Sequence, residues 1–252
     1  MAPKILGLIG YPLTHSFSKQ YFTKKFQKEK ITNYVYLNFE LSDIKQLPNL
    51  IKSTPRLTGL NVTIPYKEQV LDYVDELSPE VKAVGAANTL LIHPVSKHIT
   101  AYNTDIYGFK HSLLPCLKPR HRKALILGTG GAAKAAAYTL QQLQIEYIMV
   151  SRHPVNDRQL AYNELTGDIV KTCLLVINTT PVGQYPDVEK YPSFPYNFIT
   201  AKHLFYDLIY NPPETKFLHL ARQKGANVCN GLEMLHLQAE KSWQIWTGQV
   251  AL

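Results

Sequence analysis

The sequence has few cysteines and lacks any long hydrophobic run. Its 252 residues include three cysteines, Cys116, Cys173 and Cys229, which lie far apart and form no Cys-x-x-Cys pair. An odd number of scattered cysteines is typical of reduced thiols and argues against a disulfide framework. No apolar stretch reaches the roughly 18 residues that a membrane span requires. We therefore expect a cytoplasmic protein with no membrane partner.

Signals for secretion and for metal binding are also missing. The first residues, MAPKILGLIGYP, hold a short apolar run that ends in Gly-Tyr-Pro without a small-residue cleavage site. We interpret this run as a strand rather than a signal peptide. The nine histidines form no His-Glu-x-x-His motif or similar cluster, so the sequence predicts no metal site.

The charge is basic but dispersed. Lys and Arg number 27 against 19 Asp and Glu, which gives a formal net charge of +8. The densest basic run, KPRHRK at 118–123, precedes a predicted strand and is typical of a solvated loop, so we expect no nucleic-acid partner. The positive field still favours small anions such as carboxylates and phosphates. With 45% hydrophobic residues, the chain can form one large domain or two small ones.

Runs of strand type alternate with segments of helical spacing along nearly the whole chain. Repeated strand–helix units predict an α/β fold with a parallel sheet and helices on both faces. A change of character near 104–122 predicts a domain boundary. Strands are predicted at 4–10, 34–40, 57–64, 87–93, 98–104, 124–128, 147–151, 174–178, 203–210 and 225–231. Helices are predicted at 17–29, 67–77, 106–116, 130–143, 213–225 and 231–246.

A glycine-rich turn, ALILGTGGAAKAA, joins a predicted buried strand to a predicted helix. Gly128 permits the tight turn, Gly130 lets the backbone approach a pyrophosphate, and Ala133 permits close packing of helix and strand. The N-terminus of the helix offers free N–H groups and a positive dipole end to the phosphates. The alternative is a glycine-rich turn without a ligand, but the strand–turn–helix context favours dinucleotide binding.

The end of the next strand distinguishes between the two nicotinamide cofactors. NAD sites usually place an acid about 20 residues after the first glycines, where it binds the ribose 2′-hydroxyl. Here the strand ends in Ser151-Arg152-His153, with no acid nearby. An arginine fork suits a 2′-phosphate, and Ser151 and Arg158 are candidates to assist. The alternative is a surface arginine; the position favours NADP.

Several polar residues stand where predicted strands end. Ligands of parallel α/β sheets bind beyond the carboxyl ends of the strands. Each residue also has an ordinary explanation: Ser18, Thr104 and Asp105 can cap helices, Asn88 can form a turn, and Lys67 can be solvated. The candidates in the first half of the chain are Ser16, Ser18, Asn61, Thr63, Lys67, Asn88 and Asp105.

Seven segments occur in an order and spacing that resemble the shikimate dehydrogenase family. They are GYPLTHSFS, GLNVTIPYKE, GAANTL, YNTD, GTGGAAKA, NTTPVG and NGLEMLHLQA, and the resemblance runs from residue 5 to about 246. It implies NADPH-dependent, reversible reduction of 3-dehydroshikimate to shikimate in chorismate and aromatic amino-acid biosynthesis. It also implies an α/β substrate domain at 1–103, completed by a C-terminal helix at 231–252. A Rossmann-type NADP-binding domain would span 104–230, with the site in the cleft between the two domains.

The resemblance assigns roles motif by motif. Lys67 and Asp105 would be the catalytic pair. Gly231 and Met234 would border the nicotinamide. Substrate would be bound by Ser16 and Ser18 at its carboxylate, with Tyr210 nearby, and by Asn61, Thr63, Lys67, Asn88, Asp105 and Gln238 around the ring. The cofactor would be bound by Gly128, Thr129, Gly130, Gly131, Ala132, Ser151, Arg152, Thr179, Leu208, Gly231 and Met234.

The residue types agree with the implied chemistry. Hydride addition to a ketone builds negative charge on oxygen, which requires a proton donor within hydrogen-bond reach. The ammonium group of Lys67 can stabilise and protonate that oxygen, and a carboxylate such as Asp105 can orient it. Whether Lys67 donates the proton or mainly orients and stabilises stays open at this point.

The sequence departs from the family pattern at four places. Lys19-Gln20-Tyr21-Phe22 follows HSFS, Ser151-Arg152-His153 replaces Asn-Arg-Thr, Asn230-Gly231 replaces Asp-Gly, and the short chain predicts trimmed loops near 154–170. Two alternatives stay open: a quinate/shikimate dehydrogenase with relaxed cofactor use, and a non-catalytic NADP-binding sensor. The absence of an acid beside Arg152 argues against NAD, and the presence of Lys67 and Asp105 argues against the sensor. We expect a monomer or a homodimer.

Overall fold

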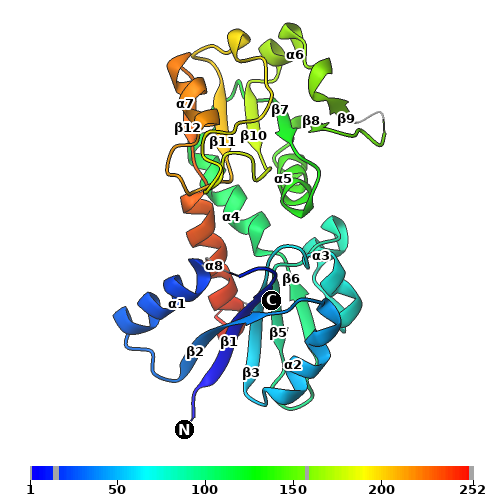
Figure 1. Cartoon of the computed structure of the whole chain (residues 1–252), viewed down its shortest axis with the longest axis vertical. Helices are drawn as coiled ribbons and strands as arrows, with labels where there is room; N and C mark the ends of the chain where they lie inside the picture. Colours follow the sequence, from blue (N-terminus) through cyan, green and yellow to red (C-terminus); the bar gives the residue numbers. More distant parts are fainter. Residues whose placement is uncertain (1, 14–16, 157–158, 250–252) are drawn as a thin grey trace. The chain divides into compact units, whose positions relative to one another are not determined.

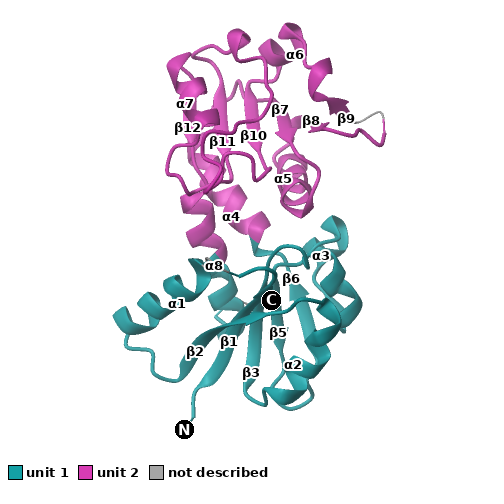
Figure 2. Cartoon of the chain, in the orientation of Figure 1, with its two compact units in different colours: residues 1–104, 239–252 teal, residues 105–238 magenta. Residues whose placement is uncertain are grey.

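The computed structural model describes residues 2–13, 17–156 and 159–249. The chain divides into two compact units, which Figure 2 distinguishes by colour. Unit 1 consists of residues 1–104 and 239–252, and unit 2 consists of residues 105–238. Each unit contains a six-stranded sheet with helices packed on both faces, as Figure 1 shows. This confirms the α/β class.

The sheet of unit 1 is mixed, in the order β2-β1-β3-β5-β6-β4. Strand β1 pairs in parallel with β2 and β3, whereas β5 pairs antiparallel with β3 and β6. The carboxyl ends of β1, β2 and β3 therefore lie at one edge of the sheet. The strands are β1 (Lys4–Gly10), β2 (Tyr34–Glu40), β3 (Leu57–Val62), β4 (Glu76–Leu77), β5 (Thr89–Ile92) and β6 (Ile99–Tyr102).

Helices cover both faces of this sheet. On one face, α1 (Phe17–Lys28) and the C-terminal part of α8 (Leu232–Thr247) bury Phe22, Trp243 and Trp246 against β1 and β2. Gly59 permits this contact, because a Cβ there would overlap the Trp246 indole. Trp246 Nε1 in turn donates a hydrogen bond to the Leu90 carbonyl at 2.9 Å. On the other face lie α2 (Leu47–Ser53) and α3 (Pro79–Val84).

The predicted helix at 67–77 is wrong. Only a short 3-10 helix, η2 (Gln69–Tyr73), forms there, and the chain then becomes extended at Val74 and pairs as β4 with β6. The Asp75 N–H donates to the Ile99 carbonyl at 2.9 Å. Pairing at the edge of the sheet therefore overrides the helical spacing of the apolar residues.

The sheet of unit 2 is entirely parallel, in the order β12-β11-β10-β7-β8-β9. Counted within this unit, the order is that of a Rossmann fold, with the switch point between β7 and β10, where dinucleotides bind. The Rossmann-type prediction is confirmed. The strands are β7 (Lys123–Leu127), β8 (Glu146–Ser151), β9 (Gln159–Ala161), β10 (Leu175–Asn178), β11 (Leu204–Asp207) and β12 (Asn227–Cys229).

Helices also cover both faces of the second sheet. One face carries α4 (Thr104–Leu113), α5 (Gly131–Gln142) and the first part of α8; the other carries α6 (Gly167–Thr172) and α7 (Lys216–Gln223). Helix α4 starts earlier than predicted, so Thr104 and Asp105 lie within its first turn. It stops before Pro115, and η3 (Leu114–Cys116) follows.

The closing helix belongs to both units. Its residues up to Gln238 are part of unit 2, and those from Ala239 are part of unit 1. In unit 2, Gly108 lets α4 approach α8 closely, because a Cβ there would lie 2.6 Å from the Met234 carbonyl oxygen. No helix within the described residues is both long and apolar enough to cross a membrane.

Candidate functional site

The segment after β3 holds Lys67 in a fixed backbone frame. Thr63 donates its N–H to the Ile9 carbonyl at 2.9 Å, and the Lys67 carbonyl accepts the Ala87 N–H at 2.8 Å. Between them, the buried Tyr66 donates its hydroxyl to the Leu41 carbonyl at 2.6 Å. Lys67 itself is half-buried. Its backbone is thus fixed by β1 and by the segment before β5, while its side chain keeps access to solvent.

A buried network of polar side chains lies beside this segment in unit 1. Asn61 accepts a hydrogen bond from the Tyr36 hydroxyl at 2.8 Å and donates to Ser242 Oγ at 3.0 Å. Ser18 hydrogen-bonds the same Tyr36 hydroxyl. Burial raises the pKa of Tyr36, so that this hydroxyl remains a donor. The network connects α1, β2, β3 and α8, and it engages two of the predicted substrate residues, Ser18 and Asn61.

The same network fixes the start of α4. The side-chain oxygen of Asn88 accepts the Thr104 N–H at 2.7 Å and the Thr104 hydroxyl at 3.1 Å. Thr89 joins this pair to Ser242, with an Oγ–Oγ distance of 2.8 Å. Asp105 is the next residue along α4 and is 7% exposed. Asn88 is therefore a positioning group for the turn that carries Asp105.

Sequence reasoning missed several members of this network: Tyr36, Thr89, Thr104 and Ser242. Ser242 is fully buried on the apolar side of α8, and a small polar residue on a buried helical face was the available signal. Asn38, which follows Tyr36 on the same side of β2, was also missed. Its buried side-chain oxygen has no hydrogen-bond partner among the described residues. Unit 1 therefore holds five of the predicted substrate residues: Ser18, Asn61, Thr63, Lys67 and Asn88.

The glycine turn of unit 2 is tight at its first glycine and open beside its second. Gly128 has a φ of +115°, and a Cβ there would lie 2.5 Å from Thr179 Oγ1. Thr179 Oγ1 donates to the Leu127 carbonyl at 2.7 Å, which ties the end of β10 to the turn. A Cβ at Gly130 would meet no atom within 4 Å. No side chain of the described residues caps α5, so its first N–H groups are available to an anion.

The residues predicted to bind the 2′-phosphate of the cofactor lie at the end of β8. Arg152 is exposed, and Ser151 is half-buried and accepts the His153 N–H at 3.1 Å. Burial raises the pKa of Tyr162, and the positive charge of Arg152 acts in the opposite direction. The Arg152 guanidinium therefore lies close enough to Tyr162 to influence its pKa. Arg158 and Ser16 lie outside the described residues.

The loop after β11 packs against the start of α8. The Gly231 N–H donates to the Ile209 carbonyl at 3.1 Å, and a Cβ at Gly231 would overlap the Leu208 carbonyl. Met234 is buried in the core under α4 and α5. Tyr210 is half-buried, and burial raises its pKa. Unit 2 therefore holds Asp105, Tyr210 and Gln238 of the predicted substrate set, together with all predicted cofactor residues.

A buried carboxylate supports this part of unit 2. Asp207, at the end of β11, accepts hydrogen bonds from Thr215 Oγ1 at 2.6 Å and Asn178 Nδ2 at 3.0 Å. Burial raises the pKa of Asp207 to about 6, while these hydrogen bonds act in the opposite direction. Asn178 in turn accepts the Thr180 N–H at 3.0 Å. The carboxylate thus ties together the ends of β10 and β11 and the start of α7.

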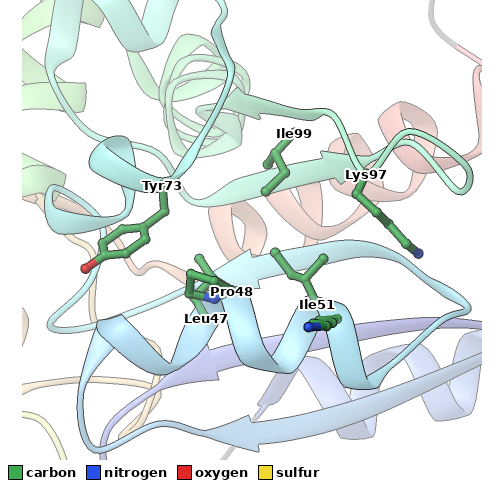
Figure 3. Close-up of a pocket in the computed structure, with 7 residues that line it drawn as sticks. Leu47, Pro48, Ile51, Tyr73, Lys97 and Ile99 are labelled. Carbon is green, nitrogen blue, oxygen red and sulfur yellow. The ribbon is translucent and has the colours of Figure 1, made fainter.

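One hollow of unit 1 contains none of the predicted site residues. It has a volume of about 380 Å³ and opens between α2 and the β5–β6 hairpin, as Figure 3 shows. Its wall is mainly apolar and includes Leu47, Ile51 and Ile99, on the sheet face that α8 does not cover. This hollow is therefore not part of the candidate site.

Comparisons with known proteins show which family the chain is similar to. Residues 8–90 match the family model described as the shikimate dehydrogenase substrate binding domain. The chain is 37% identical to the shikimate dehydrogenase (NADP⁺) of Carboxydothermus hydrogenoformans, over 97% of this chain and 92% of that one. Two crystal structures are similar with a TM-score of 0.84. Shikimate dehydrogenase 1 from Peptoclostridium difficile is 36% identical, covering 99% of this chain and 93% of that one. Shikimate 5-dehydrogenase from Thermus thermophilus, in complex with NADP(H) and shikimate, is 29% identical, covering 97% and 94%.

Proposed function

The chain belongs to the shikimate dehydrogenase family, and from this premise we propose that it reversibly reduces 3-dehydroshikimate to shikimate with NADPH. The observation that carries the proposal is the pairing of two features on one chain. Unit 1 presents Lys67 beside a preorganised polar network, and unit 2 presents an open glycine turn on a Rossmann sheet. We also propose a cytoplasmic location, which the three free cysteines support.

The residues of unit 1 suit a small polyhydroxylated acid. Ser18, Thr63 and Asn88 offer hydroxyl and amide groups, and the network around Asn61 restricts their freedom. Such preorganisation lowers the entropic cost of binding. We assign Ser16 and Ser18 of unit 1 and Tyr210 of unit 2 to the carboxylate. Asn61, Thr63, Asn88 and Gln238 are assigned to the ring hydroxyls.

Lys67 and Asp105 are proposed as the catalytic pair. The Lys67 ammonium group holds the proton that the ketone oxygen receives on reduction, and it stabilises the negative charge that builds there. The Asp105 carboxylate binds a ring hydroxyl and orients the substrate. The buried position of Asp105 in the first turn of α4, directly after the residue that Asn88 fixes, supports this role.

Unit 2 fits NADP(H), which supplies or accepts the hydride when bound. The open space at Gly130 and the uncapped N-terminus of α5 suit the pyrophosphate, with Thr129, Gly131 and Ala132 beside it. Ser151 and Arg152 suit the 2′-phosphate. Thr179, Leu208, Gly231 and Met234 are assigned to the nicotinamide side, and the close backbone packing of Gly231 on Leu208 supports a defined wall there.

A four-way assay tests the proposal. Purified protein is given shikimate or quinate, each with NADP⁺ or NAD⁺, and reduced nicotinamide is followed by absorbance. We expect efficient turnover with shikimate and NADP⁺ only. Comparable rates with quinate or with NAD⁺ would identify a relaxed quinate/shikimate dehydrogenase. NADP binding without turnover of either acid would favour the sensor and contradict the proposal.

A further inference from the structure

Two cysteines that are remote in sequence meet in unit 2. Cys116 is the last residue of η3 and Cys229 is the last residue of β12. Both side chains are half-buried, and each thiol shifts the pKa of the other. They line the same hollow, of about 550 Å³, which opens beside α7. Small solutes can therefore reach both sulfur atoms.

Charged and polar groups from several elements face this pair. His111 and Ser112 come from α4, and Glu233 comes from α8. Arg222 of α7 lines the same hollow but is paired with Glu214, with an Nε–Oε1 distance of 2.8 Å. Below the thiols, the buried Tyr206 hydroxyl hydrogen-bonds Ser112 Oγ at 2.6 Å, and burial raises the pKa of Tyr206. The Ser112 carbonyl accepts the Cys116 thiol proton at 3.8 Å when the thiol is neutral.

The two thiols differ in acidity. The adjacent Cys229 thiol lowers the pKa of Cys116 to about 7, and burial acts in the opposite direction. The adjacent Cys116 thiol and burial both raise the pKa of Cys229. The direction of this difference is that of a nucleophilic cysteine beside a resolving cysteine.

We propose that Cys116 and Cys229 form a redox-active dithiol that hydrogen peroxide converts into a disulfide. The Cys116 thiolate attacks one peroxide oxygen, the O–O bond breaks, and Cys116 sulfenic acid and hydroxide form. Cys229 sulfur then attacks the Cys116 sulfur, the S–O bond breaks, and the departing hydroxide takes the Cys229 proton as water. Both sulfur atoms are oxidised and the peroxide is reduced to two water molecules. Closure brings the two sulfurs to about 2.05 Å from each other.

Cys173 provides an internal contrast. It is 2% exposed and lies in the core under α6 and α7, on the opposite sheet face from the dithiol. Burial raises the pKa of its thiol. Among the described residues, no group of three or more His, Cys, Asp and Glu side chains could hold a metal ion, so the dithiol is not part of such a cluster. We expect Cys173 to stay reduced while the dithiol oxidises.

Peptide mapping of the full-length protein tests the proposal. The wild-type protein is treated with hydrogen peroxide, denatured, alkylated with iodoacetamide, digested and analysed by mass spectrometry. We expect a peptide pair joined through Cys116 and Cys229 that dithiothreitol separates, with Cys173 alkylated. The result that would overturn the proposal is wild-type protein in which Cys116 and Cys229 remain alkylated, or in which Cys116 accumulates sulfinic acid without a linked peptide.

Single variants separate the two roles. In Cys229→Ser, the reaction should stop at Cys116 sulfenic acid, which dimedone traps; in Cys116→Ser, neither the linked peptide nor the dimedone adduct should form. Cys173→Ser is the matched control and should form the linked peptide as the wild type does. A dimedone adduct at Cys229 in Cys116→Ser would contradict the assigned roles. Because the wild-type map needs no substitution, a variant that fails to fold leaves the test intact.

Discussion

Asn61 on β3 donates its side-chain amide to Ser242 Oγ on α8 at 3.0 Å, a hydrogen bond between residues 181 positions apart in the sequence. Both side chains are almost fully buried. The bond makes the closing helix part of the polar network that orders the predicted substrate residues of unit 1. A helix at the end of the chain thus completes a surface that begins near its start.

The first prediction concerns this bond. Ser242→Ala removes the hydroxyl that bonds Asn61 and Thr89, and it leaves buried polar groups with fewer partners. We expect the free energy of unfolding to fall by about 1–3 kcal/mol. Urea denaturation measures the change. Thr247→Ala is the matched control, because its hydroxyl bonds only carbonyls of its own helix, and it should cost less than about 0.5 kcal/mol. Equal losses in the two variants would contradict the network account.

The second prediction concerns the glycine turn. A methyl group at Gly130 meets no protein atom within 4 Å, and the backbone φ there is −75°, which alanine adopts readily. Gly130→Ala should therefore leave the thermal midpoint unchanged. It should weaken NADP binding at least about tenfold, since the methyl group occupies the space assigned to the pyrophosphate. Calorimetric titration with NADP⁺ measures this, and unaltered affinity would show that the pyrophosphate binds elsewhere.

The third prediction concerns cofactor choice. Arg152→Ala removes a charged partner of the 2′-phosphate, an interaction worth about 1.5–3 kcal/mol. We expect kcat/KM for NADP⁺ to fall by roughly one to two orders of magnitude, with kcat/KM for NAD⁺ nearly unchanged. Arg120→Ala is the control, because this exposed arginine bonds the Lys202 carbonyl in a loop. Parallel losses for both cofactors would mean that Arg152 acts on the fold rather than on the phosphate.

The fourth prediction concerns pH and the buried Asp207. Its pKa of about 6 in the folded protein lies above the ordinary value of 3.8 for an aspartate. The folded state therefore binds more protons than the unfolded state between these values, and the free energy of unfolding falls as pH rises from about 4 to about 6. Asp207→Asn should remove this decline, which amounts to up to roughly 3 kcal/mol.

Denaturant titrations at several pH values test it. The difference in unfolding free energy between wild type and Asp207→Asn should change across this pH window and stay level above it. Asp168→Asn is the matched control, since the Asp168 side chain is 94% exposed, and its difference from wild type should stay level throughout. A level difference for Asp207→Asn would show that its pKa is not raised.

Much of the fold could be predicted from local patterns. Strands β1 and β2 have the predicted boundaries, because runs such as KILGLIG carry their own strand signal. The helix prediction for residues 67–77 failed because the end of this segment pairs as β4 with β6, which is distant in sequence. The short helices α2, α3 and α6 offered too few residues for a periodic signal.

In the candidate site, too, features with a local sequence pattern could be predicted and features that depend on distant partners could not. The position of the glycine turn between β7 and α5, and that of Lys67 after β3, could be predicted because their motifs are contiguous in sequence. Ser242 and the Cys116–Cys229 pair could not, because their partners are brought together only by the tertiary fold. A scattered cysteine looks the same in sequence whether or not another thiol lies beside it.

The most direct test of the central claim is the steady-state kinetics of Lys67→Ala with shikimate and NADP⁺. The wild type should turn over, and kcat of the variant should fall by about 10²–10⁴-fold, with a much smaller change in KM. Lys82→Ala, an exposed lysine of α3, is the matched control and should keep wild-type kinetics. Near-wild-type kcat in Lys67→Ala would contradict the account.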